Sequence, residues 1–554
     1  MKKHLKPSHQ PQRFQRNQLQ ERQQRMKYNN YPKKTINGLL SPKKKGRKRC
    51  SIPGYDNDTY KIQSEIHEEL INEYIPKSED EGEVVYDKCL IYSNTTENGN
   101  RTTQKCSSWV YDKTNTHNSI TTQLNLVCDD AILARHTITI FFMGYLFAMI
   151  VCGISSDRFG RKKVIIVCLF LQGSTGIAMA LISNIYAIYV LRFLTAVGGA
   201  GSYVPSVVFA SEVSSVDSRM KSSIAIEMMF SIGYMIISLL TYFVRTWRTL
   251  MIIISIPSLV LGVAYICFLD ESPRWLLNKK RTKDANIILS NIAKLNKTVL
   301  PQTEIVNISS SNNKKVEIWK MFTIPQLLKR TLVLILNWIT ISLVYYGLTL
   351  NVGKLYGNLY MNFFLNSVVE FPAYILCLLL LNRIGRRKLH SSLMILAGVM
   401  CIAGIFPVLY GTKAHRWIVT ASSILGRLFI TAAFGIVYLY TLELYPTCIR
   451  NGALGTLSTL ARFGGALAPY TFNLSDLVSG KVGRILPMVL MGALSVIAGL
   501  LSLLLPETNN RKMMDNFSDL TKSGELKLAT KKDAILKEET QPMKPIQPAE
   551  DIKF

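Results

Sequence analysis

The chain has 554 residues, 48% of them hydrophobic, and carries a formal net charge of +28 at pH 7. Its mean hydropathy is +0.17, and its apolar residues gather in runs of about 20, long enough to cross a bilayer as helices. This composition excludes an ordinary soluble protein, and the lack of a nucleophile motif, metal-ligand spacing or nucleotide-binding loop predicts that the protein is not an enzyme.

Residues 1–50 form a strongly basic segment without an apolar run. They hold sixteen Lys or Arg residues and one Glu, so this segment contributes over half of the net charge of the chain. Such a segment has too little apolar surface to bury, so we expect a disordered tail. The cluster Lys43–Arg49 would attract acidic lipid or nucleic acid, or it is simply solvated. A nucleic-acid role is not expected, since the apolar runs must lie in a bilayer.

Residues 51–135 have the opposite charge and are expected outside the cell. Seven Lys or Arg residues stand against fifteen Asp or Glu residues. Cysteines and Asn-x-Ser/Thr sequons in such a segment are typical of an oxidised, glycosylated domain. The disulfide candidates are Cys89, Cys106 and Cys128, which together with Cys50 allow three pairings. The glycosylation candidates are Asn57, Asn94 and Asn100.

Eleven apolar runs follow and predict an all-α membrane protein. Five of them lie within 136–268 and six within 329–505, so the chain divides into two halves. The expected spans are 136–155, 164–183, 185–210, 222–244, 248–268, 329–350, 358–381, 389–410, 416–441, 453–473 and 485–505.

The segments between the spans indicate the orientation of the chain. Basic residues crowd the short loops 157–163 and 386–388. The central loop 269–328 holds ten Lys or Arg residues against five Asp or Glu residues. The positive-inside rule places all three in the cytoplasm. The tail 506–554 has nine charges of each sign and is expected to be disordered and cytoplasmic.

Three motifs occur once in each half. Residues 153–163 read Gly-Ile-Ser-Ser-Asp-Arg-Phe-Gly-Arg-Lys-Lys, and residues 382–388 read Asn-Arg-Ile-Gly-Arg-Arg-Lys. In the second motif a Glu precedes an Arg by seven positions, as Glu212 precedes Arg219 and Glu443 precedes Arg450. In the third, a Glu follows the last span of each half, at Glu271 and Glu507. Matched halves predict a transporter built from parallel repeats, with its substrate bound between them near the membrane midplane.

Two halves of six spans require twelve, and the first half shows five. The missing span belongs before Cys89, where no apolar run of sufficient length occurs. We therefore expect either an altered 5′ exon or gene prediction, or a natural variant that lacks the first helix.

Several longer motifs together resemble one transporter family. They are Cys106-Ser-Ser-Trp-Val-Tyr-Asp112, Thr122-Gln-Leu-Asn-Leu-Val-Cys-Asp129, the 153–163 motif, Glu271-Ser-Pro-Arg-Trp-Leu-Leu277, Gly357-Asn-Leu-Tyr360, Val369-Glu-Phe-Pro-Ala373 and Tyr438-Leu-Tyr-Thr-Leu-Glu-Leu-Tyr-Pro-Thr-Cys-Ile-Arg-Asn451. Over roughly residues 89–508 the chain resembles the organic cation, anion and carnitine transporters of the major facilitator superfamily. Leu124 stands where that family usually has Trp.

The resemblance implies that the repeated loops act as gates on the cytoplasmic side. The glycines permit tight turns, and Asp157 has an amide or a cation as its expected partner. Asn382 replaces this aspartate in the second copy, so the second gate is expected to be weaker. Glu212 with Arg219 and Glu443 with Arg450 are expected to form salt bridges that break during transport. The other gating candidates are Arg158, Gly160, Arg161, Arg383 and Arg386.

Charged residues inside the spans are the strongest candidates for function, because burying charge in a membrane is unfavourable. They are Arg192, Glu370, Arg427 and Arg462. In the resembled family, cation transporters have Asp at the position of Arg462, whereas anion and carnitine transporters have Arg. A guanidinium holds a carboxylate through two parallel hydrogen bonds, so Arg462 favours a substrate with a carboxylate. The alternative is an internal partner for Arg462.

Glu370, Tyr345 and Tyr346 complete the predicted substrate site. Glu370 would face the ammonium group of a substrate or a coupling ion, or it would neutralise an arginine within the membrane. The tyrosine rings are candidates for a trimethylammonium group, since a cation over a ring face gains about 0.5–2 kcal/mol. The alternative for both tyrosines is helix packing.

We therefore expect a multi-pass plasma-membrane transporter of small organic ions, carnitine-like zwitterions or organic cations, that works by alternating access. No cofactor is expected, and coupling to Na⁺ or H⁺ is left open. A sugar-porter-like facilitator shares the loop motif, but the cysteine-bearing segment and the charges inside the spans disfavour it. A non-transporting or regulatory variant without the first helix is the other alternative.

Overall fold

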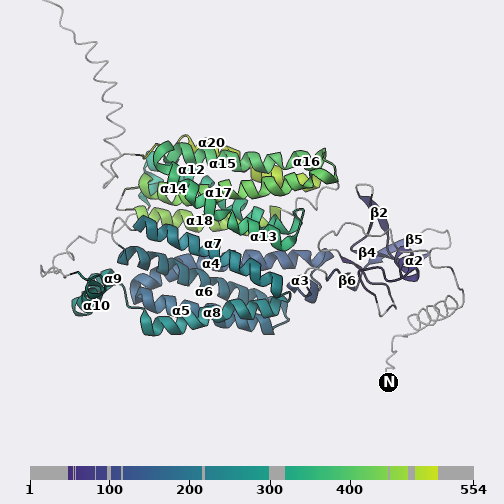
Figure 1. Ribbon diagram of the computed structural model, residues 1–554, viewed down its shortest axis with the longest axis horizontal. Helices are drawn as coiled ribbons and strands as arrows, with labels where there is room; N and C mark the ends of the chain where they lie inside the picture. Colours follow the sequence, from purple (N-terminus) through teal and green to yellow (C-terminus); the bar gives the residue numbers. More distant parts are fainter. Residues whose placement is uncertain are drawn as a thin grey trace, which may run out of the picture.

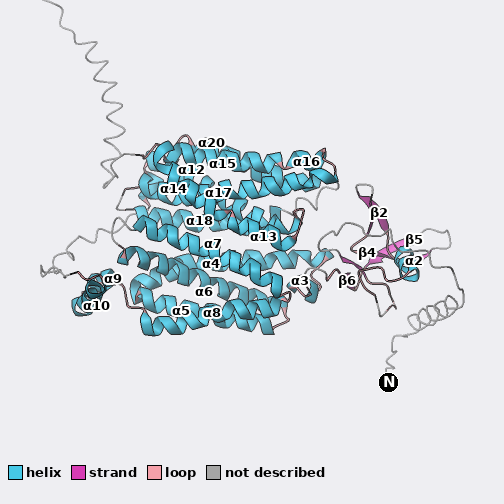
Figure 2. Ribbon diagram, viewed as in Figure 1, coloured by secondary structure: helices cyan, strands magenta, loops and turns pink. Residues whose placement is uncertain are grey.

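The structure is a computed structural model that contains a bundle of long helices and a small domain at one end of it (Figure 1). Figure 2 shows that the strands are confined to the small domain, which we name the cysteine domain (residues 48–130). The residues that the structure describes are 48–53, 55, 58–80, 83–95, 101–113, 117–214, 219–298, 319–446, 449–471 and 481–509.

The bundle consists of two groups of helices, one below the other in Figure 1. The first half contains α4 (Ala131–Phe159), α5 (Arg161–Leu181), α6 (Ile185–Val213), α7 (Arg219–Phe243) and α8 (Trp247–Phe268). The second half contains α12 (Pro325–Asn351), α13 (Leu359–Val368), α14 (Glu370–Ile384), α15 (Arg386–Ala403), α16 (Ile405–Leu409), α17 (Arg416–Leu444), α18 (Arg450–Thr471) and α20 (Lys481–Ser502). Each of the eleven predicted spans is helical, which confirms the predicted all-α membrane fold.

Ten spans in the described part of the chain are long and apolar enough to cross a membrane. Two of these ten are interrupted helices, α13 with α14 and α15 with α16. The eleventh is α18, which is less apolar because it contains Arg462 and several small residues. These small residues permit close packing: a Cβ atom on Gly464 would overlap the Ile339 carbonyl oxygen of α12.

The interruption between α13 and α14 places a charge in the middle of a span. Pro372 occupies the first turn of α14, where its missing N–H has no helical partner to lose. Glu370 is the first residue of that helix. Its carboxylate therefore lies near the positive end of the helix dipole, which lowers the cost of burying the charge.

The cysteine domain combines α2 (Glu65–Tyr74) with three antiparallel strand pairs. The pairs are β1 (Lys48–Cys50) with β6 (Trp109–Tyr111), β2 (Lys77–Asp80) with β3 (Glu83–Tyr86), and β4 (Leu90–Thr95) with β5 (Arg101–Lys105). Disulfides join Cys50 to Cys106 and Cys89 to Cys128. Strand β1 thus begins before the predicted end of the basic tail at residue 50, because it pairs with β6 and is anchored by a disulfide.

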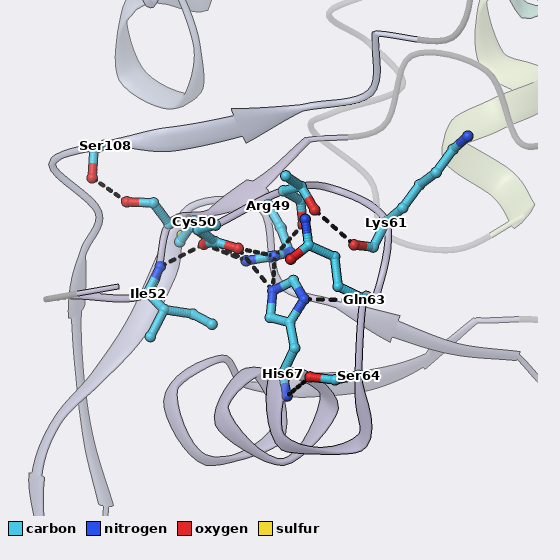
Figure 3. A network of polar contacts seen from close by, with 11 residues as sticks. Arg49, Cys50, Ile52, Lys61, Gln63, Ser64, His67 and Ser108 are labelled. Carbon is cyan, nitrogen blue, oxygen red and sulfur yellow. Dashed lines mark hydrogen bonds and ion pairs between the residues drawn. The ribbon is translucent and has the colours of Figure 1, made fainter. Parts of the chain in front are cut away.

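A buried ionic network supports the start of this domain (Figure 3). The Arg49 Nη1 donates to Asp58 Oδ2 at 2.9 Å. His67 of α2 places Nε2 at 2.9 Å from the other oxygen of Asp58, while its Nδ1 accepts from the Gln63 backbone N–H at 3.2 Å. The pairing compensates the buried charge on Arg49, so the network ties β1 to α2.

Two sequence predictions fall at or beyond the edge of the described residues. Asn94 lies in β4, whereas the sequons at Asn57 and Asn100 lie outside the described residues, as does segment 1–47 of the basic tail. Between residues 48 and 130 the longest described helix is α2, with 10 residues. The structure therefore leaves the predicted absence of a first span untested.

The central segment lies at the end of the bundle opposite the cysteine domain (Figure 1). It contains α9 (Pro273–Asn278), α10 (Thr282–Leu295) and α11 (Lys320–Thr323), and residues 299–318 lie outside the described part. Ser272 caps α9 by accepting from the Trp275 N–H at 3.3 Å. This cap positions Glu271 beside the first gating loop.

The two halves meet through α4 against α18 and through α7 against α13 and α14. Near the cysteine domain, His136 Nδ1 and the Tyr470 hydroxyl lie 2.9 Å apart across this interface. At the opposite ends of α4 and α18, a Cβ atom on Gly153 or Gly455 would meet no atom within 4 Å. The halves are therefore in contact near the cysteine domain, and these two glycines face open space.

Candidate substrate site and gating networks

Glu370 of α14 and Arg427 of α17 are buried together in the second half. Arg427 Nη2 forms an ion pair with Glu370 Oε1. The Tyr345 hydroxyl donates to the same oxygen at 2.8 Å, and the Ser231 hydroxyl of α7 donates to Oε2 at 2.6 Å. Both carboxylate oxygens are thus occupied by protein donors.

The same arginine covers Tyr345. The guanidinium carbon of Arg427 lies 3.4 Å from the centre of the Tyr345 ring, and Arg427 Nη1 donates to the Tyr345 carbonyl at 2.7 Å. The ring of Phe434 stacks on Tyr345 with centroids 5.6 Å apart. Of the alternatives for Glu370, the pairing with an intramembrane arginine is the one present. Tyr345 and Glu370, both candidates for substrate contact, each contact Arg427.

Arg462 of α18 is buried with aromatic neighbours instead of a carboxylate. Its side chain is 5% exposed, and its Nη1 lies 3.4 Å from the Tyr346 hydroxyl, which it contacts as a long hydrogen bond. Its guanidinium carbon lies 4.4 Å from the centre of the Tyr145 ring of α4. Among the described residues Arg462 has no ion-pair partner, and its Nε is buried without an acceptor.

Glu227 of α7 is a second carboxylate in the spans, which sequence reasoning missed. The Tyr203 hydroxyl of α6 donates to Glu227 Oε1 at 2.8 Å, and the Tyr374 hydroxyl is a further donor. Glu227 is half-buried, unlike Glu370. The signal was present in the sequence, because a glutamate within the apolar run 222–244 meets the same criterion as Glu370.

Arg192 of α6 is the remaining intramembrane arginine. Its guanidinium lies over the Phe141 ring of α4, 5.1 Å from the ring centre. Phe141 also packs against Tyr145, with centroids 6.3 Å apart. A row of two aromatic rings therefore runs from Arg192 to Arg462.

The first gating network joins the loop after α4 to the end of α6. Arg161 Nη2 contacts Glu212 Oε1 at 3.0 Å and Asp157 Oδ1 at 2.9 Å. The Ser272 hydroxyl donates to the other oxygen of Glu212. The expected partner of Asp157, a cation, is thus Arg161 one helical turn further on.

The second network repeats the first with different side chains. Arg386 Nε lies 3.2 Å from Glu443 Oε2, and Arg386 Nη1 donates to Asn382 Oδ1 at 3.3 Å. The Thr508 hydroxyl donates to Glu443. Thr508 therefore replaces Ser272, and an amide replaces the carboxylate of Asp157.

A glutamate caps the helix that follows each loop. Glu271 Oε1 accepts from the backbone N–H groups of Arg161 and Lys162 at 2.9 and 3.2 Å. Glu507 accepts from those of Arg386 and Arg387 at the same two distances. A carboxylate at a helix N-terminus is favoured by the dipole and by the free N–H groups. The sequence showed these glutamates as a repeated pair without revealing this role.

Positive backbone angles allow this close approach. Gly160 has φ +109° and Gly385 has φ +91°, a region that favours glycine. A Cβ atom at either position would also strike the capping carboxylate.

The pKa of Glu507 reflects its capping role. Burial alone would raise the pKa, but the N–H groups of Asn509, Arg386, Thr508 and Arg387 stabilise the carboxylate and lower the pKa below its usual value.

The remaining gating candidates are Arg158, Arg383, Arg450 and Arg219. Arg158 packs over the Phe159 ring at 5.4 Å, and Arg383 is exposed near the end of α14. Arg450 Nε donates to the Tyr445 carbonyl at 3.4 Å. Arg219 begins α7, and its side chain lies outside the described part. Both Glu212 and Glu443, expected to pair with Arg219 and Arg450, contact the arginines of the repeated loops.

Comparison with known proteins places this arrangement in a family. Residues 130–469 match the family described as Major Facilitator Superfamily. The organic cation transporter protein of Drosophila melanogaster is 34% identical over 485 residues, covering 85% of this chain and 86% of that protein. The human organic cation/carnitine transporter 2 is 34% identical over 420 residues, covering 74% and 73%. The chain belongs to the organic cation and carnitine transporter family of the major facilitator superfamily.

Solved structures agree with this fold. The proton:xylose symporter XylE bound to 6-bromo-6-deoxy-D-glucose has a TM-score of 0.56 at 16% identity, covering 71% of this chain and 90% of that one. A partially occluded inward-open XylE from E. coli has a TM-score of 0.54 at 16% identity, covering 70% and 90%. At this identity the likeness concerns the fold alone. The predicted family and the prediction of a transporter, not an enzyme, are confirmed.

Proposed function

We propose that this transporter carries carnitine-like zwitterions or small organic cations across the plasma membrane by alternating access. The observation that supports this most is Arg462, a buried guanidinium between the halves that has aromatic neighbours and no ion-pair partner among the described residues. Relatives named as organic cation and organic cation/carnitine transporters support the substrate class.

The charges inside the spans favour a substrate with a carboxylate. Away from the ends of the spans, the described part contains three arginines, Arg192, Arg427 and Arg462, against the two glutamates Glu227 and Glu370. Glu370 already neutralises Arg427. A bound carboxylate would balance the remaining positive charge, and burial of balanced charge costs less than burial of a single charge. Tyr346 would help to orient Arg462.

The contacts between the halves support a state that is open on the cytoplasmic side. The halves touch near the cysteine domain through His136 and Tyr470, while Gly153 and Gly455 face open space. A cysteine introduced at Gly455 is expected to react with a membrane-impermeant thiol reagent added from the cytoplasmic side, whereas one at His136 is not. Equal reaction at both positions would contradict this state.

Uptake measurements test the proposed function directly. Cells expressing the protein would be supplied with labelled carnitine, tetraethylammonium or a dicarboxylate, and uptake would be normalised to the amount at the surface. We expect carnitine uptake to fall at least about tenfold in Arg462→Asp, since hydrogen bonds to charged groups contribute about 1.5–3 kcal/mol. Tetraethylammonium uptake should change less.

A matched control separates a local effect from misfolding. Arg281→Asp changes an exposed arginine of the central segment in the same way and should leave uptake unchanged. Equal loss of both substrates in Arg462→Asp would indicate a structural role for the arginine. Absence of uptake by the wild-type protein for every probe would contradict the proposal and favour a non-transporting role.

A further inference from the structure

The two glutamates in the spans differ in what they can still bind. Glu370 is 0% exposed, and its oxygens are taken by Arg427, Tyr345 and Ser231. A substrate ammonium group would have to displace Arg427, leaving that guanidinium buried without a carboxylate, which is strongly unfavourable. Glu370 is therefore a poor site for the cationic end of a substrate.

Glu227 has no such cation beside it. Its described hydrogen-bond partners are the hydroxyl groups of Tyr203 and Tyr374, and it forms no ion pair within the described residues. Its side chain on α7 is half-buried, whereas Glu370 on α14 is fully buried. A ligand cation that binds this carboxylate would therefore have no protein cation to displace.

Glu227 and Arg462 lie within electrostatic range of each other without forming an ion pair. Two tyrosines lie near both charges: Tyr145 and Tyr438 each interact electrostatically with Glu227 and with Arg462. Their rings are suitable surfaces for the methyl groups of a quaternary ammonium. The two opposite charges therefore lie near the same two aromatic rings without forming an ion pair with each other.

We propose that Glu227 binds the cationic end of a zwitterionic substrate whose carboxylate is held by Arg462. This inference rests on the proposed function, and it moves the cation site from Glu370 and Tyr345 to the opposite half of the bundle. Glu227 belongs to α7 of the first half, and Arg462 belongs to α18 of the second. A substrate held in this way bridges the halves, so its binding favours their closure around it.

The arrangement also defines which ligands are selected. A short zwitterion satisfies both charges at once, whereas a simple anion leaves Glu227 without a partner and a simple cation leaves Arg462 without one. A buried charge without a partner weakens the binding of both the simple anion and the simple cation. The site should therefore rank a zwitterion above an anion or a cation of the same size.

Three ligands of similar shape test this assignment: carnitine, its isostere with a tert-butyl group in place of trimethylammonium, and tetraethylammonium. Inhibition of carnitine uptake by each would be measured for the wild type, Glu227→Gln and Arg462→Gln. We expect Glu227→Gln to raise the KM for carnitine at least about tenfold and to leave inhibition by the tert-butyl carboxylate unchanged or stronger. Arg462→Gln should weaken the carboxylates and spare tetraethylammonium.

Two further variants make the result specific. Glu227→Asp keeps the charge and should therefore bind carnitine more tightly than Glu227→Gln does. If Glu227 only filled space, the shorter Asp would not restore affinity. Glu69→Gln, at an exposed position of α2, controls for expression and should leave all three ligands unaffected.

The outcomes separate this inference from the function on which it rests. If the wild type transports carnitine and Glu227→Gln keeps the same KM, or loses carnitine and the tert-butyl carboxylate equally, Glu227 is not the cation site although the protein is a carnitine carrier. If the wild type neither transports nor is inhibited by any of the three ligands, both proposals are overturned.

Discussion

The first half anchors its gating loop with an ion pair at the position where the second half uses a neutral amide. Asp157 contacts Arg161, whereas Asn382 contacts Arg386. The two networks are otherwise alike. Each has a glutamate at a helix end, Glu212 or Glu443, and a second glutamate that caps the next helix, Glu271 or Glu507. The shared parts satisfy backbone N–H groups and a buried guanidinium, while the variable part lies at the surface: the side chain of Asp157 is 74% exposed.

The two arginines also differ in burial. The side chain of Arg161 is 8% exposed and that of Arg386 is 14% exposed, and Arg386 has Asn509 as an additional partner. A more enclosed charge depends more strongly on its carboxylate, because less solvent is available to replace it. The first network should therefore be the more sensitive of the two.

Removal of the buried carboxylate should have the largest effect. Glu212→Ala leaves Arg161 without its enclosed partner, and we expect a loss of about 3 kcal/mol of stability, the scale for breaking a buried ion pair. Glu443→Ala should cost less, because Arg386 keeps Asn382 and Asn509. Thermal unfolding of the purified variants in detergent would measure this. A larger loss for Glu443→Ala would reverse the comparison.

Loss of the capping charge should have an intermediate effect that is alike in both halves. Glu271→Gln and Glu507→Gln each keep an acceptor oxygen but lose the favourable charge at a helix N-terminus, worth about 1 kcal/mol. Unfolding midpoints should fall by similar amounts, with Glu69→Gln as an exposed control. Clearly unequal shifts would show that the caps are not equivalent.

Exchange of the variable residue should have a smaller effect. Asp157→Asn makes the first gate resemble the second, and Asn382→Asp does the opposite. An exposed ion pair contributes under about 1 kcal/mol, so we expect small opposite shifts in stability and in the reactivity of a cysteine at Gly455. Unchanged uptake and unchanged reactivity in both variants would remove Asp157 from the gating mechanism.

The pH dependence of the second cap should be the smallest effect near neutrality. The pKa of Glu507 is lowered in the folded protein, so its contribution is present above the unfolded pKa of about 4.3 and is lost as the pH falls through the lower folded pKa. The difference in unfolding midpoint between wild type and Glu507→Gln should stay constant from about pH 8 to 6 and shrink only below about pH 4.5. A difference that changes between pH 6 and 8 would point to another group.

Local patterns predicted most of the architecture. Each of the eleven spans was visible as an apolar run, because a membrane helix must be apolar along its own length. The interruption before Glu370 was not predicted, since 358–381 was expected as one span, whereas the glycines of the gating loops follow from the turns they must make. The matched motifs showed that each half has a corresponding loop, including the difference between Asp157 and Asn382.

Charge pairing was predicted less well. Glu212 and Glu443 were expected to pair with arginines seven residues away; both contact arginines of the repeated loops, and the expected pairs stay predictions because the side chain of Arg219 lies outside the described residues. For Glu370 the sequence left two partners open, a ligand or an intramembrane arginine, and the structure shows an ion pair with Arg427. Glu227 was overlooked although a glutamate within the run 222–244 meets the criterion applied to Glu370, and its contacts with α6 and the second half emerge only from the packing.

The chain thus carries its number of spans, its internal repeat and its family in its own residues, since these depend on local hydropathy and on motifs within single loops. Only the tertiary structure decides which distant residues pair. It joins Cys50 to Cys106 and Arg427 to Glu370, and it brings Glu227 near Arg462 without an ion pair. Side chains on different helices face one another according to how those helices pack, and long-range packing leaves no mark in the spacing of residues along the chain.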